Sequence, residues 1–170
     1  MDTQAQLTHD ENRFSQHTFP LIVVCDSISF LDNIGSLFRI CEAMGVEKII
    51  FFGEGLDFNL RKINKTSRST HKQLSYEVLQ HKKDLLEYLK SNEFEIIALE
   101  ITDQSIPLQS LQFKTSFPKV LLIGNEITGI SDDVLQLAQQ TVHITMFGAN
   151  SSMNVVQAAS IALYEMTNQL

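Results

Sequence analysis

The stretch ITMFGANSSMNVVQAASIALY, residues 144–164, joins an apolar, strand-like segment to an apolar helix through a loop of small and polar residues. No side chain between Gly148 and Ser152 is large, and the helix begins beside Ser152 and Asn154. Ser and Asn are good helix N-caps, because their side-chain oxygens accept the unpaired N–H groups of the first turn. Capping alone would account for Ser152 and Asn154, so these two residues do not by themselves indicate a functional site.

The length and composition indicate one ordinary globular domain. The chain has 170 residues, of which 44% are hydrophobic and 19% charged, and no apolar run approaches the roughly 20 residues of a membrane span. Residues 1–18 are polar and aperiodic, with neither the basic start nor the apolar core of a signal peptide. We therefore expect a flexible tail at 1–18 and a single domain at 19–170.

The cysteines favour a cytoplasmic location. Cys25 and Cys41 lie among apolar neighbours, which is typical of reduced core residues in a cytoplasmic protein. The five histidines show no ligand spacing with them, so no metal site is predicted.

Apolar strand patterns alternate with helix patterns along the chain. Strands are expected at 19–26, 48–53, 74–80, 94–101, 119–124 and 141–146, and helices at 33–44, 82–92, 131–140 and 154–169. Ser131 is the expected N-cap of the third helix. Alternation with buried strands predicts an α/β domain with a mostly parallel sheet flanked by helices on both faces.

Three loops leave the expected carboxyl ends of strands, where α/β sheets bind ligands: residues 26–39, 124–129 and 147–154. In the second, Gly124 and Gly129 would let the backbone approach a ligand closely or adopt a positive φ, although glycines also punctuate ordinary turns. A phosphate loop would require Lys at 130, where Ile130 stands, and the GxGxxG pattern is absent.

The net charge of −7 argues mildly against nucleic acid as a partner, but its distribution argues the other way. The segment 61–72, RKINKTSRSTHK, holds five of the 13 basic residues and no acid. We interpret it as a loop. Its mixture of basic residues with Ser, Thr and Asn is typical of loops that contact phosphates, and a solvated loop is the alternative.

Taken together, NIGSLFR, GNEITGI and ITMFGANSSMNVVQAA resemble, in order and spacing, the three motifs of the SpoU/TrmH-type RNA 2′-O-ribose methyltransferases of the SPOUT superfamily. The resemblance spans residues 21–168. The motif positions fall on Asn33, Gly35 and Arg39, then on Gly124, Glu126 and Gly129, and then on Ser152 to Val155. Thr145 replaces the usual Pro, Met153 replaces Leu, and Phe30-Leu31 replaces Asp-Pro, but no polar group that the chemistry needs is lost.

The resemblance implies a C-terminal trefoil knot, S-adenosylmethionine as cofactor, and a homodimer whose active sites are completed by the second subunit. The implied activity is 2′-O-methylation of a ribose in structured RNA. A tRNA is favoured because a catalytic domain alone suits a small target. The alternatives are ribosomal RNA as the substrate, another SPOUT activity on a base or a different RNA, an RNA-binding module without catalysis, and a purely structural dimer.

The resemblance also assigns roles to residues. The catalytic set is Arg39, Asn33, Glu126, Ser152 and Asn154, with Arg39 acting on the 2′-hydroxyl, although an ordinary exposed arginine remains an alternative. The expected cofactor-binding residues are Leu99, Glu100, Ile123, Gly124, Gly129, Ile144, Met146, Ser152 and Met153. Arg61, Lys65 and Arg68 are expected to contact RNA.

Overall fold

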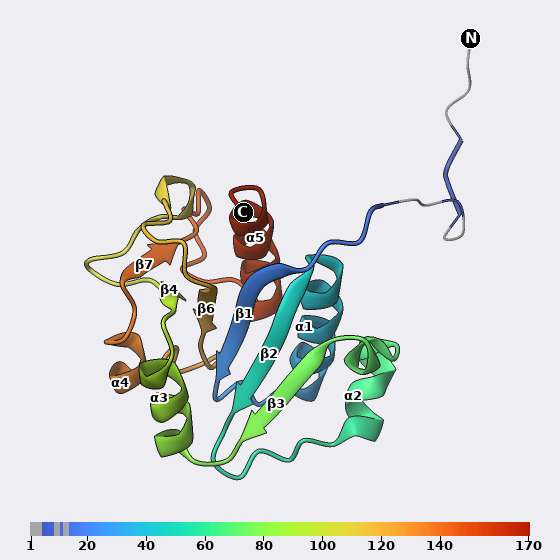
Figure 1. Cartoon of the computed structure of the whole chain (residues 1–170), viewed down its shortest axis with the longest axis horizontal. Helices are drawn as coiled ribbons and strands as arrows, with labels where there is room; N and C mark the ends of the chain where they lie inside the picture. Colours follow the sequence, from blue (N-terminus) through green and yellow to red (C-terminus); the bar gives the residue numbers. More distant parts are fainter. Residues whose placement is uncertain (1–4, 9–10, 12–13) are drawn as a thin grey trace.

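The computed structural model describes residues 5–8, 11 and 14–170, and its centre is a sheet of seven strands. Figure 1 shows the sheet with the helices around it. The strand order is β3-β2-β1-β6-β4-β7-β5, and every neighbouring pair is parallel, which confirms the predicted α/β fold. The strands are β1 Phe19–Asp26, β2 Val46–Phe52, β3 Ser75–Leu79, β4 Glu95–Leu99, β5 Ile106–Pro107, β6 Lys119–Ile123 and β7 Gln140–His143.

Helices cover both faces of the sheet. They are α1 Leu31–Ala43, α2 Leu60–Ser67, α3 Lys82–Ser91, α4 Asp132–Leu135 and α5 Val155–Thr167, with short 3₁₀ turns η2 Thr70–Lys72 and η3 Leu108–Ser110. Within β1, Leu21, Val23 and Cys25 face a core shared with α1 and α5, whereas Ile22 and Val24 face a core shared with α3 and α4. The strands are apolar throughout because each face is buried.

Both cysteines are buried in the core on the α1 and α5 side and form no disulfide, as the sequence indicated. Burial raises the pKa of the Cys25 and Cys41 thiols, which keeps them protonated at neutral pH. In the described part of the chain, no helix is long and apolar enough to cross a membrane.

The basic segment 61–72, predicted to be a loop, is instead helix α2 followed by η2. The Asn59 side chain caps α2 by accepting from Lys62 N at 3.1 Å. Ile63 and Ser67, four residues apart, are buried on the face that packs against α1. Gly35 permits this contact, since a Cβ there would lie only 2.7 Å from Thr66 Cβ. The charged exposed face of α2 concealed this narrow apolar stripe in the sequence.

The other differences are in the bounds of elements. The helix expected at 131–140 covers only Asp132–Leu135, because the chain turns to pair with β4, where Gln139 N donates to Ile96 O. Ser131 is at the N-cap position as predicted, but its side chain makes no capping bond, because the Ser131 hydroxyl donates to Asp26 Oδ2 at 2.6 Å. The strand expected at 141–146 ends at His143, which leaves 144–154 as an irregular segment before α5.

Candidate functional site

A cavity of about 930 Å³ opens at the carboxyl ends of β4, β6 and β7. The segments 124–129 and 144–154 form much of its wall. All nine residues expected to bind a cofactor line it: Leu99, Glu100, Ile123, Gly124, Gly129, Ile144, Met146, Ser152 and Met153. The fold therefore brings together, in one concave site, residues that are spread between positions 99 and 153 of the sequence.

A chain of side-chain hydrogen bonds joins the three motifs at this cavity. Asn33 Nδ2 donates to Glu126 Oε1 at 2.7 Å, and Asn154 Nδ2 donates to Asn33 Oδ1 at 3.1 Å. Asn154 Oδ1 in turn accepts from Val156 N at 2.9 Å, so Asn154 caps α5 as predicted. Asn154 therefore has both roles raised by the sequence: it starts the last helix, and it fixes the orientation of the Asn33 amide.

The second oxygen of Glu126 is unsatisfied. Glu126 Oε2 is buried and has no hydrogen-bond partner among the described residues. A buried acceptor without a donor costs about 1–3 kcal/mol, and more when it is charged, so such an atom indicates a site that a donor completes. Asp32 and Glu100 also line the cavity, whereas no Lys or Arg is among its lining residues in the described chain. The fixed charges of this site thus favour a cation or a hydrogen-bond donor.

Glu100 organises the loops around the cavity. Its Oε1 accepts from Ile101 N at 2.9 Å and its Oε2 from Ile130 N at 3.1 Å. Gly129 has φ +70°, a backbone conformation that favours glycine, and a Cβ there would lie 2.5 Å from Glu100 Oε2, so a larger residue would displace that carboxylate.

Gly124 lines the cavity, and its lack of a side chain also serves the loop itself. A Cβ at Gly124 would collide with the backbone of Gly129 and Ile130 rather than occupy space for a ligand. The segment 124–129 closes on itself here through two 3.0 Å bonds between the backbones of Asn125 and Gly129. Gly124 is therefore needed to form the loop, and enlarging it would disrupt the loop before it affected any ligand.

Of the two remaining catalytic candidates, Ser152 lies at the cavity and Arg39 does not. Ser152 lines the cavity and is exposed. Arg39 lies on an exposed part of α1 and outside the lining of the cavity, and its side chain makes no hydrogen bond or ion pair with any described residue. The chain therefore gathers four of the five expected catalytic residues, Asn33, Glu126, Ser152 and Asn154, and leaves the fifth on the outer surface.

Three exposed cations project from the end of the molecule formed by α2. Arg61 and Lys65 lie on α2, and Arg68 follows it in a left-handed conformation with φ +49°. In the part of the chain that the structure describes, none of them forms an ion pair. Their charge is therefore available to an external anion.

Several residues that line the cavity were not predicted from the sequence, and one of them is a histidine. His143 ends β7, lines the cavity, and bonds through Nδ1 to Ser105 Oγ at 2.9 Å. The sequence pattern placed His143 inside the strand expected at 141–146, so nothing in the sequence marked it as a residue of the cavity.

Comparison with known proteins gives consistent matches. The model of the SpoU rRNA Methylase family matches residues 20–164. A tRNA (guanosine(18)-2′-O)-methyltransferase of Aquifex aeolicus is 30% identical over 88% of this chain and 69% of that protein. A 23S rRNA (uridine(2479)-2′-O)-methyltransferase of Streptomyces viridochromogenes is 30% identical over 81% of this chain, but only 48% of that protein is covered.

Among solved structures, the A. aeolicus TrmH/SpoU tRNA modifying enzyme superposes with a TM-score of 0.79 at 27% identity. That match covers 91% of this chain and 77% of the other.

Proposed function

The chain belongs to the SpoU rRNA methylase family, and on that basis we propose that it transfers a methyl group from S-adenosylmethionine to a ribose 2′-hydroxyl of structured RNA. The observation that carries the proposal is the hydrogen-bonded chain of Asn33, Glu126 and Asn154 at the rim of the cavity. A tRNA is the favoured substrate, because this chain covers a larger share of the tRNA-modifying relative than of the rRNA-modifying one. Ribosomal RNA is the second candidate.

The cavity fits S-adenosylmethionine. Its lining combines apolar side chains such as Leu99 and Ile144 with the backbone of 124–129 and with three carboxylates, and it includes no Lys or Arg among the described residues. A cationic sulfonium is compatible with these charges. When bound, this cofactor supplies a methyl group on a sulfur that leaves as a neutral thioether, so the reaction requires no metal ion.

The chain's own residues would hold and orient the ribose. The Asn33 amide is fixed at both ends, by Glu126 and by Asn154, and each of the two asparagine amides retains a second N–H for a ribose oxygen. Ser152, exposed on the cavity wall, adds a hydroxyl. Because these groups are oriented before substrate arrives, positioning the hydroxyl costs little additional entropy.

Arg39 would act on the hydroxyl from a second copy of the chain. In the part of the chain that the structure describes, no Lys or Arg lines its own cavity, and the buried Glu126 Oε2 there has no donor. We infer that Arg39 of one subunit enters the cavity of the other, where Glu126 holds the guanidinium. A guanidinium remains protonated in proteins, so its role is to orient the 2′-oxygen and stabilise its developing negative charge.

Exposed apolar side chains around the cavity support a homodimer. Phe30 is 56% exposed, Ile127 86% and Phe147 96%, and all three lie in or beside segments that line the cavity. A second subunit would remove this surface from water. Sedimentation at micromolar concentration should therefore show a dimer, and a stable monomer under those conditions would contradict the composite site.

Two further properties follow from family membership and belong to the same proposal. The segment 144–170 would thread through the loop that precedes it to form the trefoil knot, and the two segments 124–129 and 144–154 do wall the same cavity. The protein would act in the cytoplasm, where its RNA substrates are made.

Two measurements test the function. Calorimetric titration with S-adenosylmethionine should show one site per chain, and incubation with unmodified tRNA should yield a 2′-O-methyl nucleoside detectable by mass spectrometry of digests. Cofactor binding without methylation of tRNA or rRNA would favour the RNA-binding module, and absence of cofactor binding would refute the proposal.

The RNA-binding role of α2 gives a separate prediction. Replacing Arg61, Lys65 and Arg68 together with alanine should weaken RNA binding and make its log–log dependence on salt shallower by about two to three units. The physical reason is that each phosphate contact releases condensed counterions. Filter binding over a range of salt concentrations measures the slope.

A matched control removes three exposed lysines from another surface, Lys83, Lys90 and Lys114. This variant loses the same total charge, so its slope should stay close to that of the wild type. Equal slopes for the two triple variants would assign the α2 cations to general surface charge.

A further inference from the structure

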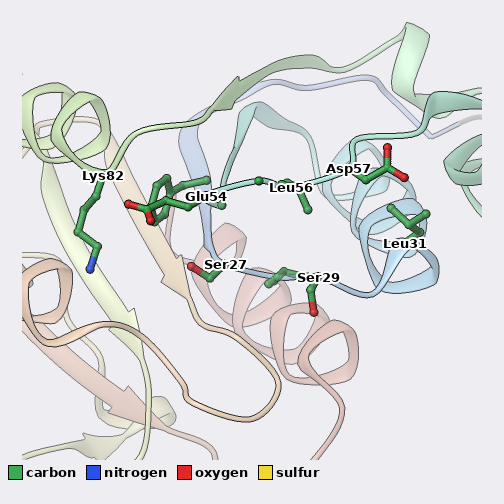
Figure 2. A pocket seen from close by; sticks show the side chains of 11 residues that line it. Ser27, Ser29, Leu31, Glu54, Leu56, Asp57 and Lys82 are labelled. Carbon is green, nitrogen blue, oxygen red and sulfur yellow. The ribbon is translucent and has the colours of Figure 1, made fainter.

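A second hollow, of about 550 Å³, lies at the carboxyl ends of β1 and β2 (Figure 2). Its polar groups come from three places: Ser27 and Ser29 after β1, Glu54 and Asp57 after β2, and Lys82 at the start of α3. Leu56 contributes an apolar wall.

The hollow is the neighbour of the cavity along one edge of the sheet. The strand order β2-β1-β6 places the two only one or two strands apart, or about 5–10 Å. The start of α1 separates them: Leu31 lines the hollow, whereas Asp32 and Asn33 line the cavity. On its other side, α2 begins at Leu60, three residues after Asp57. The hollow therefore lies between the cations of α2 and the residues that would hold the ribose.

Most polar side chains of the hollow have no hydrogen-bond partner among the described residues. In the described part of the chain, the side chains of Ser29, Glu54 and Asp57 form no hydrogen bond. Lys82 Nζ has one contact, to Asp133 Oδ1 at 3.2 Å, which leaves other N–H groups of the ammonium free. The Glu54 carboxylate points toward the Lys82 side of the hollow, so a strong acceptor and a strong donor lie along the same wall (Figure 2).

These groups select one kind of ligand. Two carboxylates disfavour a phosphate, so the occupant should be neutral and should present N–H donors. A nucleobase meets this requirement, since single-stranded RNA is read through the Watson–Crick edges of unstacked bases. On guanine that edge carries two adjacent N–H donors, which a carboxylate accepts together, beside a carbonyl oxygen, which an ammonium can reach. The Watson–Crick edges of adenine, cytosine and uracil do not carry two adjacent N–H donors beside a carbonyl oxygen.

We propose that this hollow binds a guanine base of the RNA substrate, within one nucleotide of the methylated ribose, with Glu54 accepting from the base and Lys82 donating to it. The proposal rests on the proposed function for the identity of the polymer. It assigns to Glu54 and Lys82 the selection of the base, and to the cavity the methyl transfer.

Direct binding tests the hollow without any methylation. Guanosine, adenosine, cytidine and uridine are titrated separately into labelled protein, and the amide signals of Gly53 and Gly55, which line the hollow, are followed by NMR. Guanosine should move both signals and bind more tightly than the other three nucleosides. Glu54→Gln, which keeps the shape of the side chain, should weaken guanosine about tenfold or more, because a charge-assisted bond is lost.

Glu93→Gln, at another exposed glutamate, is the control and should leave guanosine binding unchanged. In single-turnover methylation of a verified RNA, Glu54→Gln should raise the apparent Kd for RNA and leave the saturating rate unaltered. Equal shifts with all four nucleosides, or unchanged guanosine affinity in Glu54→Gln, would overturn the proposal. Because the titration contains no cofactor, its outcome does not depend on whether the protein methylates RNA.

Discussion

Replacing Arg39 with alanine is expected to slow methyl transfer by about 10²–10⁴-fold and to leave the binding of S-adenosylmethionine unchanged. Arg39 lies on an exposed part of α1 outside its own cavity, so its loss removes no contact that stabilises the subunit. An interaction made only in the transition state lowers kcat and kcat/KM together. Single-turnover transfer to a verified RNA, with calorimetry of cofactor binding, measures both parts of the prediction.

Arg39→Lys should restore little of this rate. An ammonium is a point charge and cannot reproduce the planar fork with which a guanidinium would engage Glu126 and the ribose oxygen together. A near-normal rate for Arg39→Ala would instead show that Arg39 is an ordinary surface residue. Removing such a residue changes the free energy of unfolding by about a few tenths of a kcal/mol.

Mixing two inactive variants distinguishes a composite site from a self-contained one. If Arg39 acts in the cavity of the other subunit, a heterodimer of Arg39→Ala with Asn33→Ala holds one site with both defects and one site with neither. Random exchange of subunits should then restore about a quarter of the wild-type activity. No recovery in a sample shown to contain heterodimers would place Arg39 in its own subunit's site and contradict the inferred exchange.

The edge of the sheet that carries the site could be predicted from the sequence, but the contacts within it could not. Asn33, Glu126 and Asn154 each follow an apolar strand, and parallel strands present their carboxyl ends on one side. The bonds that link the three side chains depend on the loop conformations. Those conformations depend in turn on contacts between distant residues, such as Asp26 with Ser131 and Asn125 with Ser27.

Helix α2 shows why composition misled the prediction. Its eight residues hold three cations and one buried apolar side chain, Ile63, so no amphipathic pattern was evident. The helix forms because Gly35 allows Thr66 and Ile63 to approach α1 closely, which is a property of two segments rather than of one. Strand β5 was missed for a similar reason, since two residues that include Pro107 form a strand only beside β7.

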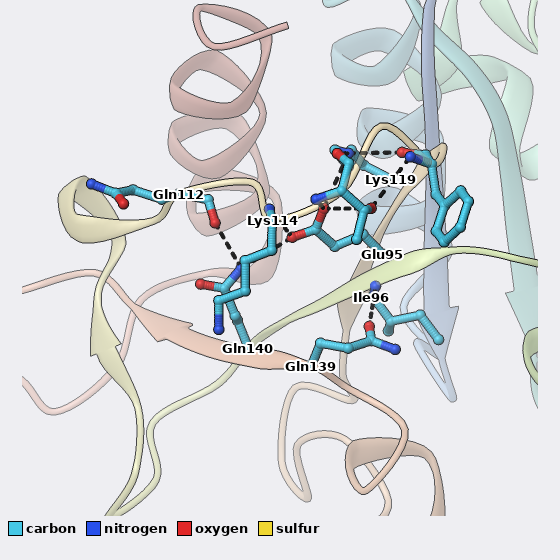
Figure 3. Close-up of polar contacts among 9 residues, drawn as sticks. Glu95, Ile96, Gln112, Lys114, Lys119, Gln139 and Gln140 are labelled. Carbon is cyan, nitrogen blue, oxygen red and sulfur yellow. Dashed lines mark hydrogen bonds and ion pairs between the residues drawn. The ribbon is translucent and has the colours of Figure 1, made fainter.

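The feature that was hardest to predict is a buried ion pair at the amino ends of β4 and β6, opposite the ends that carry the cavity (Figure 3). Lys119 Nζ lies 3.1 Å from Glu95 Oε2, and the two side chains are 3% and 1% exposed. In the sequence both residues look like exposed charges at the starts of strands, but the register of β4 on β6 places them opposite each other. Lys119 also donates to Thr115 O at 2.6 Å and to Phe117 O at 2.7 Å.

Glu95 is equally well satisfied. It accepts from Lys114 N, from Thr115 N and Oγ1, and from Gln140 Nε2. Burial would raise the pKa of Glu95, but the hydrogen bonds from Lys114, Thr115 and Lys119 outweigh burial and hold that pKa below its ordinary value. The pair therefore stabilises the fold above the pKa of an unfolded glutamate, and this stabilisation is lost as the pH falls through the lowered pKa of the folded state.

Lys119→Met should lower the free energy of unfolding by about 3–5 kcal/mol at pH 7, because it leaves the Glu95 carboxylate buried without its cation and removes the donor from two carbonyls. For a domain of this size the melting temperature should fall by about 6–20 °C. Without the hydrogen bond from Lys119, the pKa of Glu95 should rise from its value in the wild type, so protonation relieves the unpaired charge at a higher pH and the deficit should narrow as the pH falls toward about 4. The double variant Glu95→Gln/Lys119→Met has no buried charge at this site, and it should recover much of the loss at pH 7.

Urea unfolding of the wild type, the single variant and the double variant at pH 7 and at pH 4.5 measures these differences. A deficit that is the same at both pH values would trace the destabilisation to the two abandoned carbonyls and not to the charge of Glu95.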